Sequence, residues 1–361
     1  MFRFVPIGGF LGAGKTTTML NVGRLLEAAG ERVAVITNDQ GGDLVDTELS
    51  RSAELAGVGE VTGGCFCCKF EDLTAVIGEL EAQVHPTVVI AEAVGSCTDL
   101  QATVVRPLQQ LHGDQLSVAP LTVVVDPMRY TIMSQFWRPE LGPEPDLAYL
   151  YRHQLDEADI VAVNKVDLLS QRELDWVLGD LRTRFPHSTV LPMAAKTGSK
   201  LDELVACWSL RGDRRPFEID YQRYGAAEAE LAWTNQVFEL RATRAAFVPA
   251  DWIRAFLEEF RRRTPAGALI GHVKVRISAA AGTTKASLTQ VKTDIEFDVQ
   301  ASAPANLASC TLNARVQVTP GELERLIALS LEVANREAAT ESGPRRGEVF
   351  QPGFPVPAHR M

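Results

Sequence analysis

Three of the six cysteines stand within four positions, in the stretch GGCFCCK between Gly63 and Lys69. Thiolates are soft ligands, so Cys65, Cys67 and Cys68 suit Zn²⁺ and also accept Cu(I), or Co²⁺ and Fe²⁺ with less preference. Three protein ligands leave one coordination position of the metal open. A protein that transfers its metal to a partner requires such an open position. The spacing predicts a transition-metal site just before a helix that begins near Phe70.

Other interpretations of this cluster remain open. Cys67 and Cys68 could form a vicinal disulfide, or the three thiols could serve redox chemistry or simply be buried. His112 is a candidate fourth ligand, although nothing in its setting QLHGDQ requires that role. The remaining cysteines are interpreted as isolated core residues: Cys97, Cys207 and Cys310.

A second motif, GFLGAGKTT, predicts phosphate binding. It follows an apolar run and opens a helical pattern, which is the context of a G-x-x-x-x-G-K-[ST] loop. Glycines let the backbone wrap around phosphates, the lysine neutralises the β and γ oxygens, and the threonine hydroxyl can bind Mg²⁺. The candidate nucleotide-binding residues are Gly9, Gly12, Ala13, Gly14, Lys15, Thr16 and Thr17.

The stretch VNKVDLL predicts which base is bound. The Asp167 carboxylate can accept hydrogen bonds from the guanine N1–H and exocyclic amine, while Asn164 contacts the purine edge and Lys165 stacks over the ring. Adenine lacks both donors, so ATP should bind much more weakly. Downstream, MAAKTGSKLDEL resembles a loop that closes over guanine, with Ala195 and Lys196 at its centre.

Length and charge limit the remaining possibilities. A chain of 361 residues suits two domains, and a net charge of −10 argues against nucleic acid as a partner. No stretch has the roughly 20 apolar residues of a membrane span, and no signal peptide is legible. We therefore expect a cytoplasmic protein with no membrane partner, in which clustered cysteines bind metal or catalyse rather than form disulfides.

These motifs must be positioned by an α/β fold. Apolar runs at FRFVPIG, RVAVITN, TVVIAEAVG, LTVVVDP and DIVAVNKVD predict buried parallel strands, and helical patterns lie between them. This alternation predicts a P-loop NTPase domain with a doubly wound, mostly parallel sheet over residues 1–212, its site at the carboxyl ends of the strands.

The rest of the chain has a different pattern. Residues 213–230 are polar and predict a linker. Alternating strands and two amphipathic helices predict a smaller α+β domain with an antiparallel sheet over residues 231–336. Thr319, Pro320 and Glu322 predict a capped start for the second of those helices. Residues 337–361 are rich in proline and glycine and predict an extended tail.

Taken together, GGFLGAGKTT, the CFCC cluster, EAVG and NKVD resemble, in order and spacing, the CobW-type family of P-loop GTPases. This family is related to the GTPases that insert nickel into urease and hydrogenase. The resemblance spans about residues 4 to 205. It implies Mg²⁺-dependent GTP hydrolysis to GDP, coupled to metal delivery or to maturation of a client metalloprotein.

The resemblance also implies roles for single residues. Glu92 would hold Mg²⁺ through water, and the Gly95 amide could sense the γ-phosphate, so the catalytic candidates are Lys15, Thr16 and Glu92. Members of the family usually carry Asn-Glu where this chain has Asn38-Asp39. Asp39, with Asp43 and Asp46, is a candidate metal ligand or a polar loop residue.

The sequence thus favours a slow GTPase that couples its nucleotide to a transition metal. The alternative is a P-loop GTPase switch that assembles a protein or cofactor complex, with structural cysteines. The client is not identified by the sequence, and a homodimer is one arrangement that it leaves open.

Overall fold

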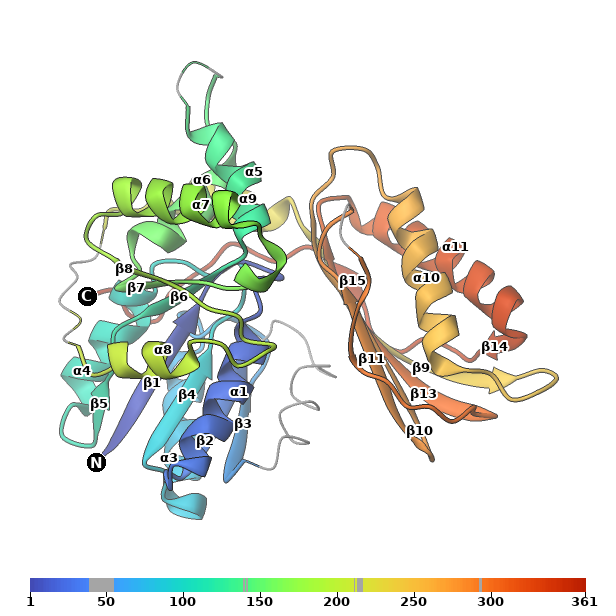
Figure 1. Ribbon diagram of the computed structural model, residues 1–361, viewed down its shortest axis with the longest axis horizontal. Helices are drawn as coiled ribbons and strands as arrows, with labels where there is room; N and C mark the ends of the chain where they lie inside the picture. The colour runs from blue at the N-terminus through green and yellow to red at the C-terminus, as the bar shows by residue number, and fades with distance from the viewer. Residues whose placement is uncertain (39–54, 139, 141, 211, 213–216, 292–293) are drawn as a thin grey trace. The chain divides into compact units, whose positions relative to one another are not determined.

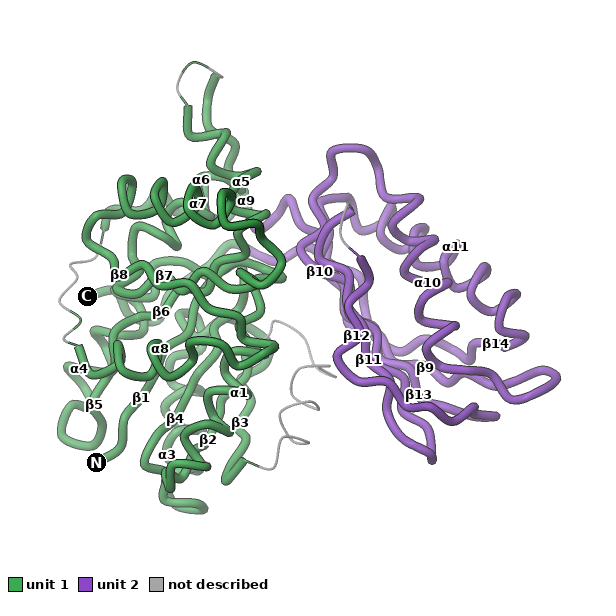
Figure 2. The backbone as a smooth tube through the Cα atoms, viewed as in Figure 1, with its two compact units in different colours: residues 1–40, 46–227, 354–361 green, residues 41–45, 228–353 purple. Residues whose placement is uncertain are grey.

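A computed structural model describes residues 1–361 apart from 39–54, 139, 141, 211, 213–216 and 292–293 (Figure 1). The chain forms two compact units (Figure 2). Of the described residues, those within 1–38, 55–227 and 354–361 belong to unit 1, and those within 228–353 belong to unit 2. Within the described parts of the chain, no helix has the length and apolar character needed to cross a membrane.

Unit 1 is built on a parallel sheet, as the sequence predicts (Figure 1). Five of its strands, β1, β2, β4, β6 and β7, are buried on both faces, which explains their continuous apolar sequences. The order across the sheet is β3 (Gly57–Val61), β2 (Val33–Asn38), β4 (Val88–Glu92), β1 (Phe2–Gly8), β6 (Thr122–Val125), β7 (Ile160–Val163) and β8 (Thr189–Pro192), and β5 (Leu116–Val118) pairs with β1.

Helices follow the strands along the chain and supply the second layer of the core. Met19 and Leu20 of the first helix pack with Leu201 and Leu204 against the strands. The helices of unit 1 are α1 (Lys15–Ala28), α3 (Phe70–Val84), α4 (Arg106–His112), α5 (Pro127–Met133), α6 (Asp146–Asp156), α7 (Gln171–Arg184), α8 (Leu201–Cys207) and α9 (Tyr221–Ala229), with shorter turns η1 (Gln101–Val105), η2 (Ser134–Trp137) and η4 (Val166–Leu168).

Unit 2 is an antiparallel sheet covered by two helices, α10 (Pro249–Arg263) and α11 (Pro320–Ala338) (Figure 1). The predicted capping box is present, because Thr319 and Glu322 exchange hydrogen bonds at the start of α11. The strand order is β12 (Glu296–Val299), β11 (Gly282–Leu288), β10 (Ile270–Ala279), β13 (Leu307–Val316), β9 (Ala232–Ala242) and β14 (Thr340–Ser342), and β15 (Val349–Phe350) pairs with β9.

The fold class predicted from the sequence is confirmed, while two details differ. The expected linker contains helix α9, whose residues up to Ala227 belong to unit 1. The expected tail is not uniformly extended, since β14 and β15 pair with β9 and only residues 354–361 join unit 1. Backbone pairing with an existing strand orders a segment that has little apolar periodicity of its own.

Candidate nucleotide and metal site

The phosphate loop lies between β1 and α1, where the sequence places it. Gly9 and Gly14 have positive φ angles of 126° and 96°. A Cβ atom at Gly9 would lie 2.3 Å from the Val124 carbonyl oxygen, and one at Gly14 would lie 2.3 Å from Nδ2 of Asn164. Both positions therefore require glycine for conformation and for space.

The next two residues, Lys15 and Thr16, open α1 and are buried. Thr16 Oγ1 donates a hydrogen bond of 3.0 Å to Oε1 of Glu92, which ends β4. A hydroxyl and a carboxylate side by side at a phosphate loop are the hard oxygen donors that Mg²⁺ prefers. These two side chains thus fit the predicted magnesium site.

Gly95 lies against the phosphate loop. A Cβ atom there would approach the Leu11 backbone nitrogen to 2.9 Å, so only glycine permits this contact. Nε2 of Gln154 donates to the carbonyl oxygens of Gly95 and Cys97 at 3.0 and 2.7 Å. The segment after Glu92 is therefore held from α6 as well as from the loop.

The NKVD motif follows β7, at the same edge of the sheet as the phosphate loop. Asn164 is buried; its Nδ2 donates to the Ala13 carbonyl oxygen at 2.9 Å and its Oδ1 accepts from the Ala195 amide at 2.8 Å. Asn164 thus joins two predicted nucleotide loops, and its contact with the purine stays a prediction. Asp167 and Lys196 are exposed, as groups that meet a ligand from solvent must be.

Two residues that the sequence analysis did not single out support these loops. Asp126, at the end of β6, accepts from two amides at the start of α5 and lies 3.1 Å from Nζ of Lys165. Asn21 of α1 donates to the Ala195 carbonyl oxygen at 2.7 Å. The sequence could have indicated Asp126, because its carboxylate directly follows the apolar run LTVVV of a predicted buried strand.

The three clustered cysteines lie together on a turn that leads into α3. Their sulfur atoms are 2.7 Å apart for Cys65 and Cys67, 3.2 Å for Cys65 and Cys68, and 3.8 Å for Cys67 and Cys68. Cys65 and Cys67 are buried, and Cys68 is partly exposed. The three sulfur atoms lie within 4.8 Å of one another, so Cys65, Cys67 and Cys68 could bind one metal ion together.

Asn38 holds this turn to the sheet. As the last residue of β2, it donates through Nδ2 to the carbonyl oxygens of Val61 and Gly64 at 3.0 and 2.8 Å, and its Oδ1 accepts from the Phe66 amide at 3.0 Å. The chain continues from Asn38 directly into Asp39. Asp39, Asp43 and Asp46 lie outside the described residues.

The pKa values of the three clustered thiols are shifted in different directions. Hydrogen bonds from Cys67, Cys68 and Cys97 hold the pKa of Cys65 well below its usual range. Hydrogen bonds of Cys67 with Cys65, Cys68 and Cys97 raise its pKa, and the hydrogen bond with Cys65 raises the pKa of Cys68 to about 11. Ionisation of one thiol disfavours ionisation of its close neighbours, so a cation would have to displace the protons that remain.

Cys97 lies next to the cysteine cluster, so its interpretation as an isolated core residue is wrong. This buried residue follows Gly95 by two positions, and its thiol interacts with Cys65 and Cys67. Cys97 is therefore not an isolated core residue. Its position depends on how the chain turns after β4, which spacing in the sequence does not reveal. The candidate fourth ligand His112 packs against Phe70, with ring centroids 6.5 Å apart.

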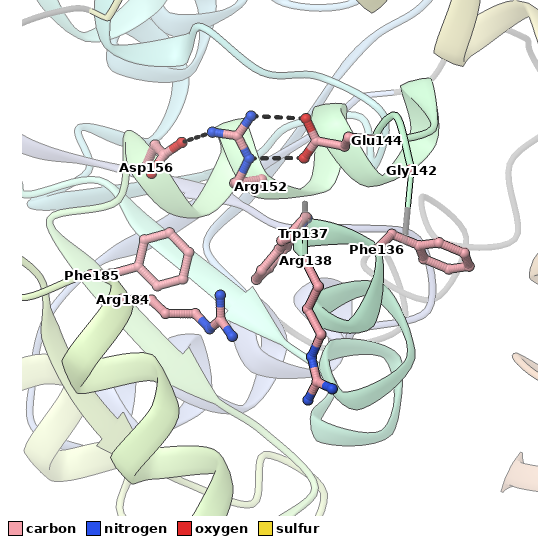
Figure 3. A pocket seen from close by; sticks show the side chains of 9 residues that line it. All are labelled: Phe136, Trp137, Arg138, Gly142, Glu144, Arg152, Asp156, Arg184 and Phe185. Atoms are coloured by element: carbon pink, nitrogen blue, oxygen red, sulfur yellow. Dashed lines mark hydrogen bonds and ion pairs between the residues drawn. The ribbon is translucent and has the colours of Figure 1, made fainter. Parts of the chain in front are cut away.

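A separate pocket of about 480 Å³ lies between η2, α6 and α7 (Figure 3). Arg152 lies there between Glu144 and Asp156, with nitrogen-to-oxygen distances of 2.8 and 3.4 Å. A second arginine, Arg184, is paired with Asp180 at 2.9 Å. The pocket contains none of the predicted nucleotide residues.

The sequence profile of the CobW/HypB/UreG nucleotide-binding domain matches residues 3–191, which is more than half of the chain. The chain belongs to the CobW/HypB/UreG family. Over 248 residues it is 28% identical to a zinc chaperone CobW of Pseudomonas aeruginosa, covering 60% of this chain and 63% of that protein. The family predicted from the four motifs is thereby confirmed.

Other proteins similar to this CobW/HypB/UreG chain share a smaller fraction of identical residues with it. A zinc-regulated GTPase metalloprotein activator 1 of Dictyostelium discoideum is 24% identical over 222 residues, covering 53% of this chain and 46% of that protein. The solved structure of Zn(II)-bound YjiA GTPase from E. coli is 14% identical with a TM-score of 0.39, covering 92% of this chain and 98% of that one. The chain spans less than two thirds of the length of the curated relatives that it matches.

Proposed function

We propose that this protein is a GTPase that binds a transition metal at Cys65, Cys67 and Cys68 and couples the metal to its nucleotide state for delivery to a client metalloprotein. Zn²⁺ is the favoured cargo for two reasons. Three close thiols are soft ligands, and the related proteins include a zinc chaperone and a zinc-regulated GTPase metalloprotein activator. Co²⁺ and Fe²⁺ are weaker candidates for the same ligands.

Two features support nucleotide binding. Asn164 joins the phosphate loop to the loop that contains Ala195, and Thr16 donates a hydrogen bond to Glu92. GTP or GDP would lie over the phosphate loop, with its base toward Asp167. Mg²⁺, when bound, would stabilise charge on the β- and γ-phosphates. Lys15 would neutralise phosphate oxygens, Thr16 and Glu92 would orient the ion and its water, and Gly95 would approach the γ-phosphate.

The observation that carries the coupling is the set of three hydrogen bonds from the side chain of Asn38. This one residue ends β2, just before the residues that we take as the first nucleotide switch, and its side chain fixes the backbone of the cysteine turn. A change in the position of Asn38 must therefore move the thiols or break buried hydrogen bonds. The alternative, a GTPase switch with purely structural cysteines, needs no exchangeable metal.

Metal titration of the reduced protein separates the two functions. We expect about one Zn²⁺ or Co²⁺ per chain, with thiolate-to-metal charge-transfer absorption in the cobalt form. Replacing Cys65, Cys67 and Cys68 together with serine should abolish this binding while GTP still binds. Normal metal binding by the triple variant would overturn the assignment of these cysteines as metal ligands. The matched control is Cys207→Ser, because that thiol lies on α8 outside the cluster.

A further inference from the structure

Residues 354–361, here called the closing segment, return to unit 1 and lie over the cysteine turn. The amide of Ala358 donates to the Cys67 carbonyl oxygen at 2.8 Å, and the amide of Val356 donates to the Cys68 thiol. The segment thus contacts the backbone of one predicted metal ligand and the sulfur atom of another.

The sequence of the closing segment suits this contact. Pro355 and Pro357 flank Val356, so φ is fixed at alternate positions and the chain is extended before it docks. Proline has no amide hydrogen, which leaves Val356 and Ala358 as the donors around this bend. Both of these amides are used at the cysteine turn. A segment already restricted in this way loses less entropy when it binds.

An ion pair anchors the far end of the segment. Arg360 Nε lies 2.9 Å from Oδ2 of Asp99, whose side chain is only 4% exposed, and the Tyr221 hydroxyl donates to the same oxygen at 2.7 Å. Burial raises the pKa of Asp99, while the hydrogen bonds from Tyr221 and Arg360 oppose that rise. A buried carboxylate that loses its cation is destabilised, so Asp99 favours the docked segment.

Two rings complete the docking. The Phe354 ring covers Gly225 of α9 so closely that a Cβ atom at Gly225 would lie 2.1 Å from Phe354 Cδ1. The His359 ring meets Phe70, the first residue of α3, edge to face at 4.9 Å, and its Nε2 lies 3.2 Å from the Glu71 carboxylate. The segment therefore spans from α9 to the start of α3.

We propose that the closing segment is a removable cover over the cysteine turn, and that its release sets the rate at which the thiols exchange metal with a partner protein. The segment is held by single amides and side chains and pairs with no described strand, so it can leave the turn without disturbing either sheet, as expected for an element that opens without global unfolding. The inference about metal exchange rests on the proposed function, whereas the cover itself does not.

Three variants release the cover by different routes. Gly225→Ala places a methyl group where the Phe354 ring lies, Arg360→Gln removes the cation from Asp99, and a chain that ends at Gly353 lacks the cover. Gly179→Ala in α7 is the matched control, because a Cβ atom there meets nothing within 4 Å. The two single substitutions keep the test valid if the shortened chain fails to fold.

The first readout is the rate at which iodoacetamide alkylates Cys68 in reduced, metal-free protein, followed by mass spectrometry. We expect at least about a tenfold increase in all three variants, which corresponds to a shift of about 1.4 kcal/mol in the opening equilibrium, and no change in the Gly179→Ala control. The second readout is the rate at which Zn²⁺ passes to a chromogenic chelator, which should rise in parallel at unchanged GTP affinity.

The outcomes separate the two hypotheses. Alkylation rates within about twofold of the parent protein in folded Gly225→Ala and Arg360→Gln variants would overturn the cover. Faster alkylation together with no Zn²⁺ binding by any form of the protein would leave the cover standing and overturn the proposed function. Faster alkylation with an unchanged Zn²⁺ transfer rate would overturn the role of the cover in metal exchange.

Discussion

The carboxamide of Asn38 accepts a hydrogen bond from the amide of Phe66, 28 positions later in the chain, at 3.0 Å. Phe66 stands between Cys65 and Cys67, so the end of strand β2 and the cysteine turn share this buried contact. The same side chain also holds the carbonyl oxygens of Val61 and Gly64. The end of β2 and the cysteine turn are thus joined by one polar side chain.

Replacing Asn38 tests the connection between the end of β2 and the cysteine turn. Asn38→Ala leaves three backbone groups without their partner and should lower the free energy of unfolding by about 1 to 3 kcal/mol. Hydrogen exchange at the Phe66 amide should become faster. Asn38→Asp keeps the acceptor for Phe66 but loses both donors, and should therefore protect that amide better than alanine does. Equal exchange at Phe66 in the parent and in Asn38→Ala would contradict the assignment.

Guanine selectivity should depend on Asp167. Its exposed carboxylate can accept from both guanine donors, whereas the carboxamide introduced by Asp167→Asn can accept only through its single oxygen. Loss of one charge-assisted hydrogen bond, about 1.5 to 3 kcal/mol, should weaken GTP binding roughly tenfold to 100-fold. Fluorescence titration of GTP and ATP measures this, with Asp202→Asn on α8 as a surface control. Equal affinity of the parent protein for the two nucleotides would refute guanine recognition.

Hydrolysis should depend on Glu92, whose Oε1 accepts from Thr16 Oγ1. Glu92→Gln keeps the shape but removes the charge that favours Mg²⁺, so the stimulation of GTP hydrolysis by Mg²⁺ should fall while GDP still binds. Phosphate release at a series of Mg²⁺ concentrations measures the effect. The exposed Glu79→Gln on α3 should behave as the parent, and an unchanged Mg²⁺ dependence in Glu92→Gln would argue against this role.

Stability should depend on pH through Glu157. Burial raises the pKa of this carboxyl to about 8, against an ordinary value of 4.5, although Thr98 and Gln101 donate hydrogen bonds to it. The folded state therefore holds a proton that the unfolded state releases. The contribution is fully present below about pH 4.5 and is lost as the pH rises to about 8.

Urea unfolding at intervals between about pH 5 and about pH 9 measures this loss. The Glu157→Gln variant cannot ionise and should show a flatter profile over the same interval. The exposed Glu203→Gln variant on α8 should retain the slope of the parent. A parent protein whose stability rises steadily between those limits would contradict the assignment of Glu157.

The sequence was informative where chemistry and local structure coincide. Gly9, Gly14 and Lys15 occupy a strand-to-helix loop whose pattern is visible without coordinates, and the three clustered cysteines are neighbours in sequence as well as in space. Continuous apolar runs also identified β1, β2, β4, β6 and β7, because parallel strands are buried on both faces.

Residues that act across long sequence separations could not be found in this way. Cys97 meets Cys65 only because β4 ends beside the cysteine turn, and Val356 reaches Cys68 from the other end of the chain. Strand β3, with the sequence GVGEV, has too little apolar character to be recognised alone and is ordered by pairing with β2. Tertiary pairing decides such cases.

The dissociation constant for Zn²⁺, measured by competition with a chelator in the presence of a non-hydrolysable GTP analogue and again with GDP, tests the coupling most directly. The two values should differ by about five- to 150-fold, and Zn²⁺ should change the affinity for the analogue by the same factor, since linkage is reciprocal. Asn38→Ala should reduce that factor. Identical Zn²⁺ affinities in the two nucleotide states of the parent protein would contradict the coupling.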